Sequence, residues 1–126
     1  MNPQKIASVL ALDAPKRYAH FIKVCADQRK MWGLYQNGWA LAESDTGEPA
    51  FPVWPAREYA VLCAVRQWEG YEPREIDLDT FFENLVPSLL DRKTILAVFP
   101  KPDQKGITPW VEEVIIDLRA ELSKIE

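Results

Sequence analysis

Apolar side chains recur with a helical period near the start of the chain. The positions with i, i+3, i+4, i+7 spacing are Tyr18, Phe21, Ile22 and Cys25. This spacing places them along one face of a helix over residues 14–27, where they would face a core. Asp13 suits the N-cap, because its carboxylate can accept hydrogen bonds from the first helical amides. A shorter helix is expected before it, over residues 3–12.

A stretch of alternating apolar and polar positions, typical of β-strands, is interrupted by Asn37-Gly38. Asn-Gly is the preferred pair for a type I′ turn, since both residues of that turn have positive φ. The sequence therefore predicts an antiparallel hairpin of strands 31–36 and 39–43. A short third strand is expected over residues 50–53, and its internal proline would confine it to a sheet edge or a strand end.

The second half of the sequence predicts two helices, a strand and a final helix. Apolar residues surround much of the helix expected over 56–69, which Gly70 would end, so we expect it to be the central core helix. Asp77 suits the N-cap of the next helix, which Pro87 would kink or end. The apolar run 94–99 predicts an interior strand.

These elements follow the order α-α-β-β-(β)-α-α-β-α. A hairpin followed by helices predicts an α+β fold, with a small, mainly antiparallel sheet of three to four strands and helices packed on it. The chain has 126 residues, of which 48% are hydrophobic, and this is enough for one hydrophobic core. We therefore expect a single domain over residues 1–126.

Charge is distributed unevenly, although the whole chain has a net charge of only −4. Residues 1–40 carry +4, residues 41–91 carry −8, and residues 92–126 are balanced. Nucleic-acid-binding proteins usually show a strong basic excess, so nucleic acid is not the expected partner. The acidic middle segment favours a basic protein partner, or serves only solubility.

Cysteine usage and hydropathy both bear on the location of the protein. Cys25 and Cys63 lie within apolar stretches, and two cysteines make no disulfide framework, so we expect two reduced thiols. The longest apolar run, Tyr59–Val65, is far too short to span a membrane, and the N-terminal segment lacks the features of a signal peptide. These features predict a cytoplasmic protein that does not associate with membranes.

Known catalytic and metal-binding motifs are absent from the sequence. His20 is the only histidine, which excludes histidine-rich metal sites, and no glycine-rich phosphate loop or Cys-x-x-Cys motif occurs. Asp77 and Asp79 form a pair of acids, but helix capping and the helix dipole explain them. We predict no catalytic residue, no metal and no cofactor, and the sequence favours a protein that is not an enzyme.

One segment, from Phe51 to Ala60, combines the features of a binding site. Trp54 lies between two prolines at a strand-to-helix junction, and Arg57 and Glu58 follow in the first helical turn, where free backbone amides also point outward. An aromatic ring, a guanidinium group and free donors would suit an anionic ligand. The alternative is a purely structural corner in which Trp54 packs in the core and Arg57 pairs with an acid.

The same segment carries a resemblance to a known family. The matching features are Gly38-Trp39-Ala40, the motif Pro-x-Trp-Pro-x-Arg-Glu-Tyr-Ala ending at Ala60, Trp68, Tyr71-Glu72-Pro73, and Val98-Phe99-Pro100. With them, residues 15–122 resemble a bacterial family known only as domain of unknown function 2750. The resemblance implies a stand-alone, single-domain bacterial protein. It implies no substrate, cofactor or catalytic residue.

Two functions from different classes remain open. The first is a protein-binding module, similar to immunity or chaperone-like proteins, whose acidic and aromatic surface steers and anchors a basic partner. The second is a small-molecule-binding protein or minor enzyme that holds an anionic ligand at the helix-start corner. The candidate binding residues are Trp54, Arg57, Glu58, Trp39 and Trp68. An open cleft beside Trp54 would favour a small ligand, whereas a flat acidic and apolar patch would favour a protein.

Overall fold

The computed structural model describes residues 1–125. Its elements are, in chain order, α1 (Pro3–Leu10), α2 (Ala14–Gln28), β1 (Lys30–Tyr35), β2 (Ala42–Glu43), β3 (Pro49–Val53), α3 (Arg57–Cys63), the 3₁₀ turn η1 (Arg66–Trp68), β4 (Glu72–Asp77), α4 (Leu78–Thr80), the π-helical turn η2 (Phe81–Leu85), α5 (Val86–Asp91), β5 (Ile95–Val98) and α6 (Val111–Ile125). The predicted α+β class is confirmed. Among the described residues, no helix combines the length and apolar character needed to cross a bilayer.

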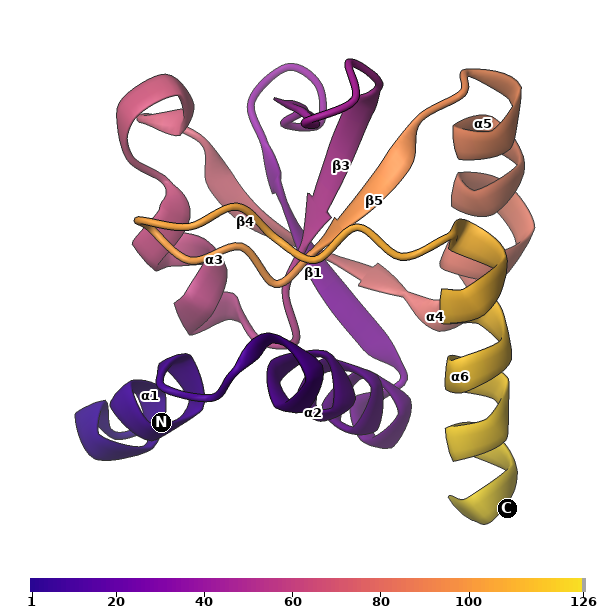
Figure 1. Cartoon of the computed structure of the whole chain (residues 1–126), viewed down its shortest axis with the longest axis horizontal. Helices are drawn as coiled ribbons and strands as arrows, with labels where there is room; N and C mark the ends of the chain where they lie inside the picture. The colour runs from indigo at the N-terminus through magenta and orange to yellow at the C-terminus, as the bar shows by residue number, and fades with distance from the viewer. Residues whose placement is uncertain (126) are drawn as a thin grey trace.

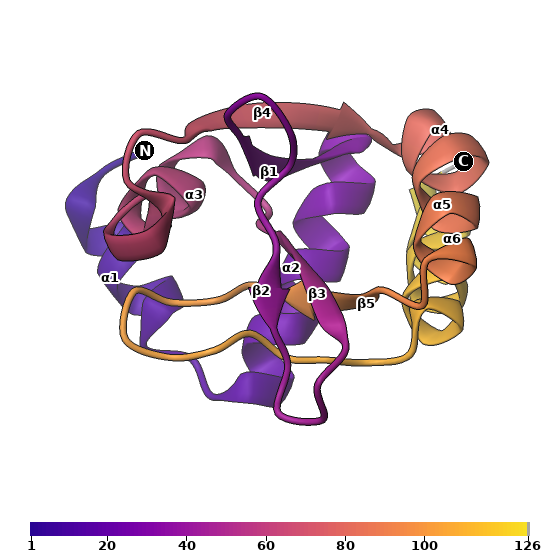
Figure 2. The same cartoon turned by 90° about the horizontal axis from the view of Figure 1, so that it is seen from above.

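The strands lie in the middle of the molecule, with helices around them (Figures 1 and 2). Helices α1 and α2 lie together below the strands in the view of Figure 1, and α4, α5 and α6 stand to one side. Helix α2 packs against α6, and the Tyr18 hydroxyl of α2 donates a hydrogen bond of 2.6 Å to Asp117 of α6. The core between these layers includes the two cysteines, both of them buried, unpaired thiols.

The strands form two small sheets. Strand β1 pairs with β4 in antiparallel orientation from Lys30–Asp77 to Tyr35–Glu72. The second sheet has the order β2-β3-β5, with β2 antiparallel and β5 parallel to β3. Two backbone hydrogen bonds between Trp32 and Trp54, of 2.9 and 2.8 Å, join the sheets.

The predicted hairpin is only partly correct. The chain does reverse at Asn37-Gly38, where φ is 55° and 150°, and Tyr35 pairs with Trp39 beside the turn. The expected strand 39–43, however, does not continue along 31–36. Strand β1 pairs with β4 instead, because β4 buries Ile76 against the core and offers six residues of partner backbone.

The position of β3 also differs from the prediction. Pro52 was expected at a sheet edge or strand end, yet it lies in the central strand of the second sheet. The geometry tolerates it because β2 pairs with β3 only as far as Ala50, and β1 joins only at Trp54. Alternate backbone nitrogens point the same way, so the proline nitrogen faces the gap between these two partners.

Strand β5 was expected to lie inside a sheet, but it is the last strand in the order β2-β3-β5. Its side away from β3 is covered instead by the segment that leads to α6. There Val98 and Ile107 exchange backbone hydrogen bonds of 2.6 and 2.8 Å. The apolar run is therefore buried without a further full strand.

The prediction of one central core helix over 56–69 is wrong. Helix α3 ends at Cys63, and Arg66, the first residue of η1, has a positive φ of 55°. This break turns Trp68 inward, where its ring meets that of Trp54 edge-to-face at 6.1 Å. The outer face of the segment is apolar but exposed, at Val61, Leu62 and Val65.

The next helix follows the prediction more closely. The Asp77 carboxylate caps it by accepting a hydrogen bond of 2.8 Å from the amide of Thr80. The π-helical turn η2 ends at Leu85, two residues before Pro87, and the helix continues through α5 to Asp91. Proline cannot donate to the preceding turn, and a π-helical turn is one way to accommodate that loss, so the helix passes through Pro87 without ending there.

Candidate functional site

Trp54, the centre of the predicted binding corner, is a core residue. Its side chain is completely buried, and the indole Nε1 donates a hydrogen bond of 2.9 Å to the carbonyl of Pro100. The flanking prolines therefore aim the ring inward. This part of the motif is structural.

The other two candidate tryptophans also pack on the core. Trp68 is 8% exposed and contacts Trp54. Trp39 is half-buried against Tyr35 and Phe51, at ring distances of 5.2 and 5.5 Å. It lies so close to Gly33 that a Cβ there would come within 2.9 Å of the indole.

Arg57 and Glu58 lie at the start of α3, nearer the surface than Trp54 and Trp68. Arg57 is exposed and Glu58 is half-buried. Within residues 1–125, neither side chain forms a hydrogen bond or an ion pair. The five predicted residues thus do not come together as one site.

The structure places a strained backbone corner next to Trp54. Phe99 is fully buried and has a φ of 54°, a conformation that bulky residues rarely adopt. Its carbonyl accepts a hydrogen bond of 3.3 Å from Arg17 Nε, and the carbonyl of Pro100 accepts from Trp54 and from Cys63 Sγ. These side chains hold the corner in place, and strained residues of this kind are concentrated at functional sites.

A cleft of about 510 Å³ opens beside this corner. Its walls are the β2–β3 turn, the η1 segment and the loop from Pro100 to Thr108. Its floor is formed by three alanines on one face of the second sheet, with Trp68 and Cys63 beside them. The register places Ala42 opposite Ala50, and Ala97 opposite Pro52 on the same face. Small side chains on three adjacent strands leave room above the sheet.

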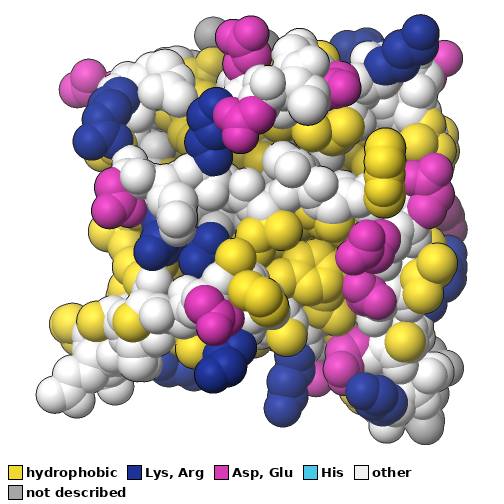
Figure 3. All heavy atoms as spheres, viewed as in Figure 1, with side chains coloured by type: hydrophobic (Ala, Val, Ile, Leu, Met, Phe, Trp, Pro, Cys, Tyr) yellow, Lys and Arg dark blue, Asp and Glu magenta, His cyan; other side chains and the backbone are white. Residues whose placement is uncertain are grey.

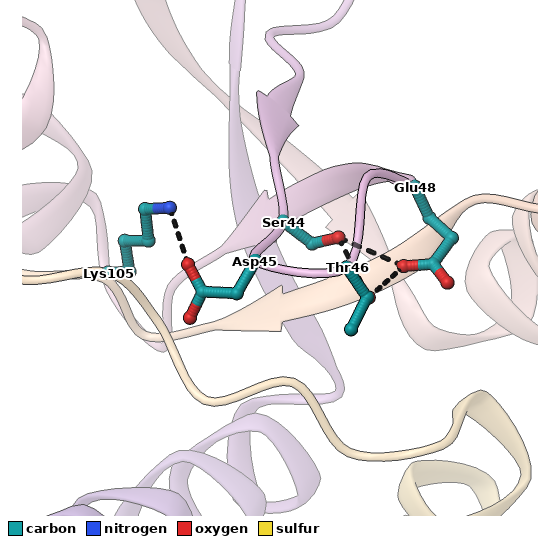
Figure 4. A network of polar contacts seen from close by, with 5 residues as sticks. All are labelled: Ser44, Asp45, Thr46, Glu48 and Lys105. Carbon is teal, nitrogen blue, oxygen red and sulfur yellow. Dashed lines mark hydrogen bonds and ion pairs between the residues drawn. The ribbon is translucent and has the colours of Figure 1, made fainter.

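One wall of the cleft is acidic. Glu43 and Asp45 belong to β2 and its following turn, and Asp45 forms an ion pair of 2.7 Å with Lys105 from the opposite loop (Figure 4). The hydrogen bond from Lys105 lowers the pKa of Asp45, and Asp45 raises the pKa of Lys105. In the same turn, the hydroxyls of Ser44 and Thr46 donate to Glu48, which orders the turn (Figure 4).

The facing wall carries cations that are bonded only to neutral groups. Arg66 Nη1 donates a hydrogen bond of 2.6 Å to the carbonyl of Pro102, and Lys101 Nζ donates one of 3.2 Å to the carbonyl of Leu10. Among the described residues, neither is paired with a carboxylate. Like Phe99, Arg66 has a strained backbone, with a positive φ.

The chemistry of the cleft suits binding. Burial raises the pKa of the Cys63 thiol to about 11, so it is protonated at neutral pH and a poor nucleophile. Within residues 1–125, no three histidine, cysteine or carboxylate side chains are grouped as metal ligands would be. What the cleft offers is an apolar floor between two charged walls.

Most of these wall residues escaped the sequence analysis. Glu43, Asp45, Arg66, Lys101 and Lys105 lie in three segments that are far apart in the chain. Each segment resembles an ordinary charged loop. Only Trp68 was among the predicted binding residues.

Comparisons with known proteins are consistent with this absence of an assigned chemistry. The family model described as "Protein of unknown function (DUF2750)" matches residues 18–118. No curated protein and no solved structure matches the chain. The matched segment runs from α2 into α6 and includes all the strands and every wall of the cleft. The chain therefore belongs to the DUF2750 family.

Proposed function

We propose that this protein binds a small molecule in the cleft between the β2–β3 turn, η1 and the loop 100–108. The observation that carries the proposal is the cleft itself, with its volume of about 510 Å³. Ligand sites of small molecules are usually concave, of a few hundred Å³, and combine an apolar surface with a few polar groups. The alanine floor and the charged walls meet that description.

The position of the cleft changes the expected binding residues. The earlier hypothesis placed an anionic ligand at Trp54, Arg57 and Glu58. The proposed site is lined by Trp68 but not by those three residues, and Arg66 takes the role that Arg57 was expected to play. Two strained residues support this location, because Arg66 lines the cleft and Phe99 directly precedes Pro100, which also lines it.

A thermal-shift screen tests the proposal. A collection of anionic, cationic, zwitterionic and neutral metabolites would be screened against the wild type and against Ala42→Leu, which adds bulk to the half-buried floor. A ligand should raise the melting temperature of the wild type but not of Ala42→Leu. The matched control is Ala120→Leu, at an exposed position of α6. Binding that survives Ala42→Leu would place the ligand elsewhere and contradict the proposal.

A protein partner is the second candidate function. Trp110, at the start of α6, is 76% exposed, and Glu112 and Glu113 follow it. Figure 3 shows hydrophobic side chains gathered between α2 and α6, with acidic side chains along the α6 side. An exposed indole next to acids would anchor a basic partner. If so, a protein co-purifying with the wild type should be lost with Trp110→Ala and with rising salt.

We also propose that the protein is bacterial and cytoplasmic, and the two unpaired, buried thiols support the cytoplasmic location. Alkylation of the unfolded protein without reductant should modify both Cys25 and Cys63. Two blocked sulfurs would contradict this location.

A further inference from the structure

We infer that the ligand of the cleft is a zwitterion with an apolar body, such as a free amino acid or a short peptide. Its cationic group would contact Glu43 and Asp45, and its anionic group would contact Arg66 and Lys101. The inference rests on the proposed function, since it assigns a chemical class to the ligand of that same cleft.

The acidic wall can bind an ammonium group, because it already binds that of Lys105 within the protein. The Lys105 ammonium reaches across the cleft to Asp45. Both side chains are largely exposed, at 68% and 86%, so the pair is a weak one. Glu43 lies close enough to raise the pKa of Lys105 further, yet it has no ion-pair partner of its own among residues 1–125. A ligand ammonium could therefore bind the unpaired Glu43 carboxylate, and it could also replace Lys105 at the Asp45 carboxylate.

The opposite wall can bind an anion. Arg66 uses a single N–H group on Pro102, and Lys101 uses one of its three donors on Leu10. Bonds to neutral carbonyls orient these side chains without neutralising them. Asp103 lies in the same loop, but among residues 1–125 it forms no ion pair with Arg66 or Lys101, so both cations remain available to a ligand. A carboxylate would gain charge-assisted hydrogen bonds here, which are stronger than those between neutral groups.

The floor between the walls determines the middle of the ligand. Ala42, Ala50 and Ala97 present methyl groups, and Trp68 adds an aromatic side chain. No charge comes from the floor, so an apolar body fits it. A singly charged ligand with the same body would leave one wall without its partner.

Isothermal titration calorimetry with matched probes tests this class. The free, N-acetylated and amidated forms of alanine, leucine and phenylalanine supply zwitterions, anions and cations with the same side chains. At least one zwitterion should bind about tenfold more tightly than both of its singly charged relatives, a difference of about 1.4 kcal/mol.

Two variants assign the ends of the ligand. Glu43→Gln should lower the affinity for the zwitterion and for the amidated form but not for the acetylated form. Arg66→Asn should lower the affinity for the zwitterion and for the acetylated form but not for the amidated form. Asparagine is chosen because it tolerates the positive φ of this position. The matched controls Glu58→Gln and Arg57→Asn lie outside the cleft and should leave all affinities unchanged.

The outcomes separate this inference from the proposed function. Equal binding of a zwitterion and its acetylated form would overturn the zwitterionic class. The zwitterionic class is also overturned if no probe binds while the metabolite screen yields a ligand that is not a zwitterion and whose binding Ala42→Leu abolishes. The proposed binding function of the cleft then stands. If neither experiment yields a ligand that depends on the cleft, both the zwitterionic ligand class and the proposed function of the cleft are contradicted.

Discussion

Two arginines show how residues of the same type take opposite roles in this molecule. Arg57, within the family motif, is exposed and has no partner in the part of the chain that the structure describes. Arg17 is 2% exposed and donates to two backbone carbonyls, those of Phe99 and Leu12, at 3.3 and 3.1 Å. Burial, and not the motif, identifies the structural arginine.

Replacing each arginine should therefore have very different effects. Arg57→Ala should change the free energy of unfolding by less than about 0.5 kcal/mol, the usual size for an exposed position. Arg17→Met should lower it by about 2–4 kcal/mol, because two carbonyls lose their donor in the interior. Urea denaturation of both variants measures the difference. A loss above about 2 kcal/mol for Arg57→Ala would show that the motif arginine is structural after all.

His20 makes the stability depend on pH near neutrality. Burial lowers its pKa, and Lys5 and Lys23 lower it further. The folded protein thus binds fewer protons than the unfolded chain just below the ordinary histidine pKa of about 6.5, so stability falls as the pH falls through this value. Because His20 is the only histidine, His20→Gln should flatten the profile between about pH 5.5 and pH 7.5. An unchanged slope in this variant would assign the effect to another group.

At the scale of single elements, the clearest local signal is the start of α2. The Asp13 carboxylate accepts a hydrogen bond of 3.0 Å from the amide of Lys16, as the sequence predicted. The helix ends at Gln28, and Arg29 adopts the left-handed conformation of a C-terminal cap. An acid is favourable at the first end and unfavourable at the second, since the helix dipole points from one to the other.

This asymmetry gives a paired test on one helix. Asp13→Ala should cost about 1 kcal/mol of unfolding free energy, because the N-cap is lost. Asp27→Ala, in the last turn of the same helix, should be neutral or slightly stabilising. Thermal unfolding of the two variants provides the comparison. Equal losses would mean that capping does not control the stability of α2.

At the scale of the whole molecule, the two sheets depend on one narrow junction. Trp32 and Trp54 exchange both backbone hydrogen bonds there, and Trp54 also anchors the Pro100 carbonyl beside the cleft. The same residue thereby links β1, β3 and the loop that forms one cleft wall. Loss of this junction would therefore both separate the two sheets and alter the cleft.

Native-state hydrogen exchange tests whether the sheets unfold as one unit. The amides of Trp32 and Trp54 should exchange only with the free energy of global unfolding. The amide of Ser44, which bonds to Glu48 within the exposed β2–β3 turn, should exchange through a much cheaper local opening. A low free energy of exchange at Trp32 would instead show that β1 and β4 open independently.

The sequence alone was sufficient for features that depend on neighbouring residues. Asp13 and Asp77 cap helices, and Asn37-Gly38 reverses the chain, each as predicted. A cap needs only an oxygen next to free amides, and a turn needs only residues that tolerate positive φ. The family motif included Trp54, which packs in the core as the structural alternative expected, but the motif does not contain its partner Trp32.

The tertiary structure decided which distant segments meet. Strand β1 pairs with β4, some forty residues away along the chain, and not with the segment 39–43 that follows it. Strand β3 pairs in parallel with the distant β5. Strand pairing follows the burial of whole faces, which no local pattern specifies. The cleft is of the same kind: its walls come from three separate loops, and each loop by itself carries only ordinary charged residues. These charges line one cleft, the proposed binding site, only because the folded core holds the three segments face to face.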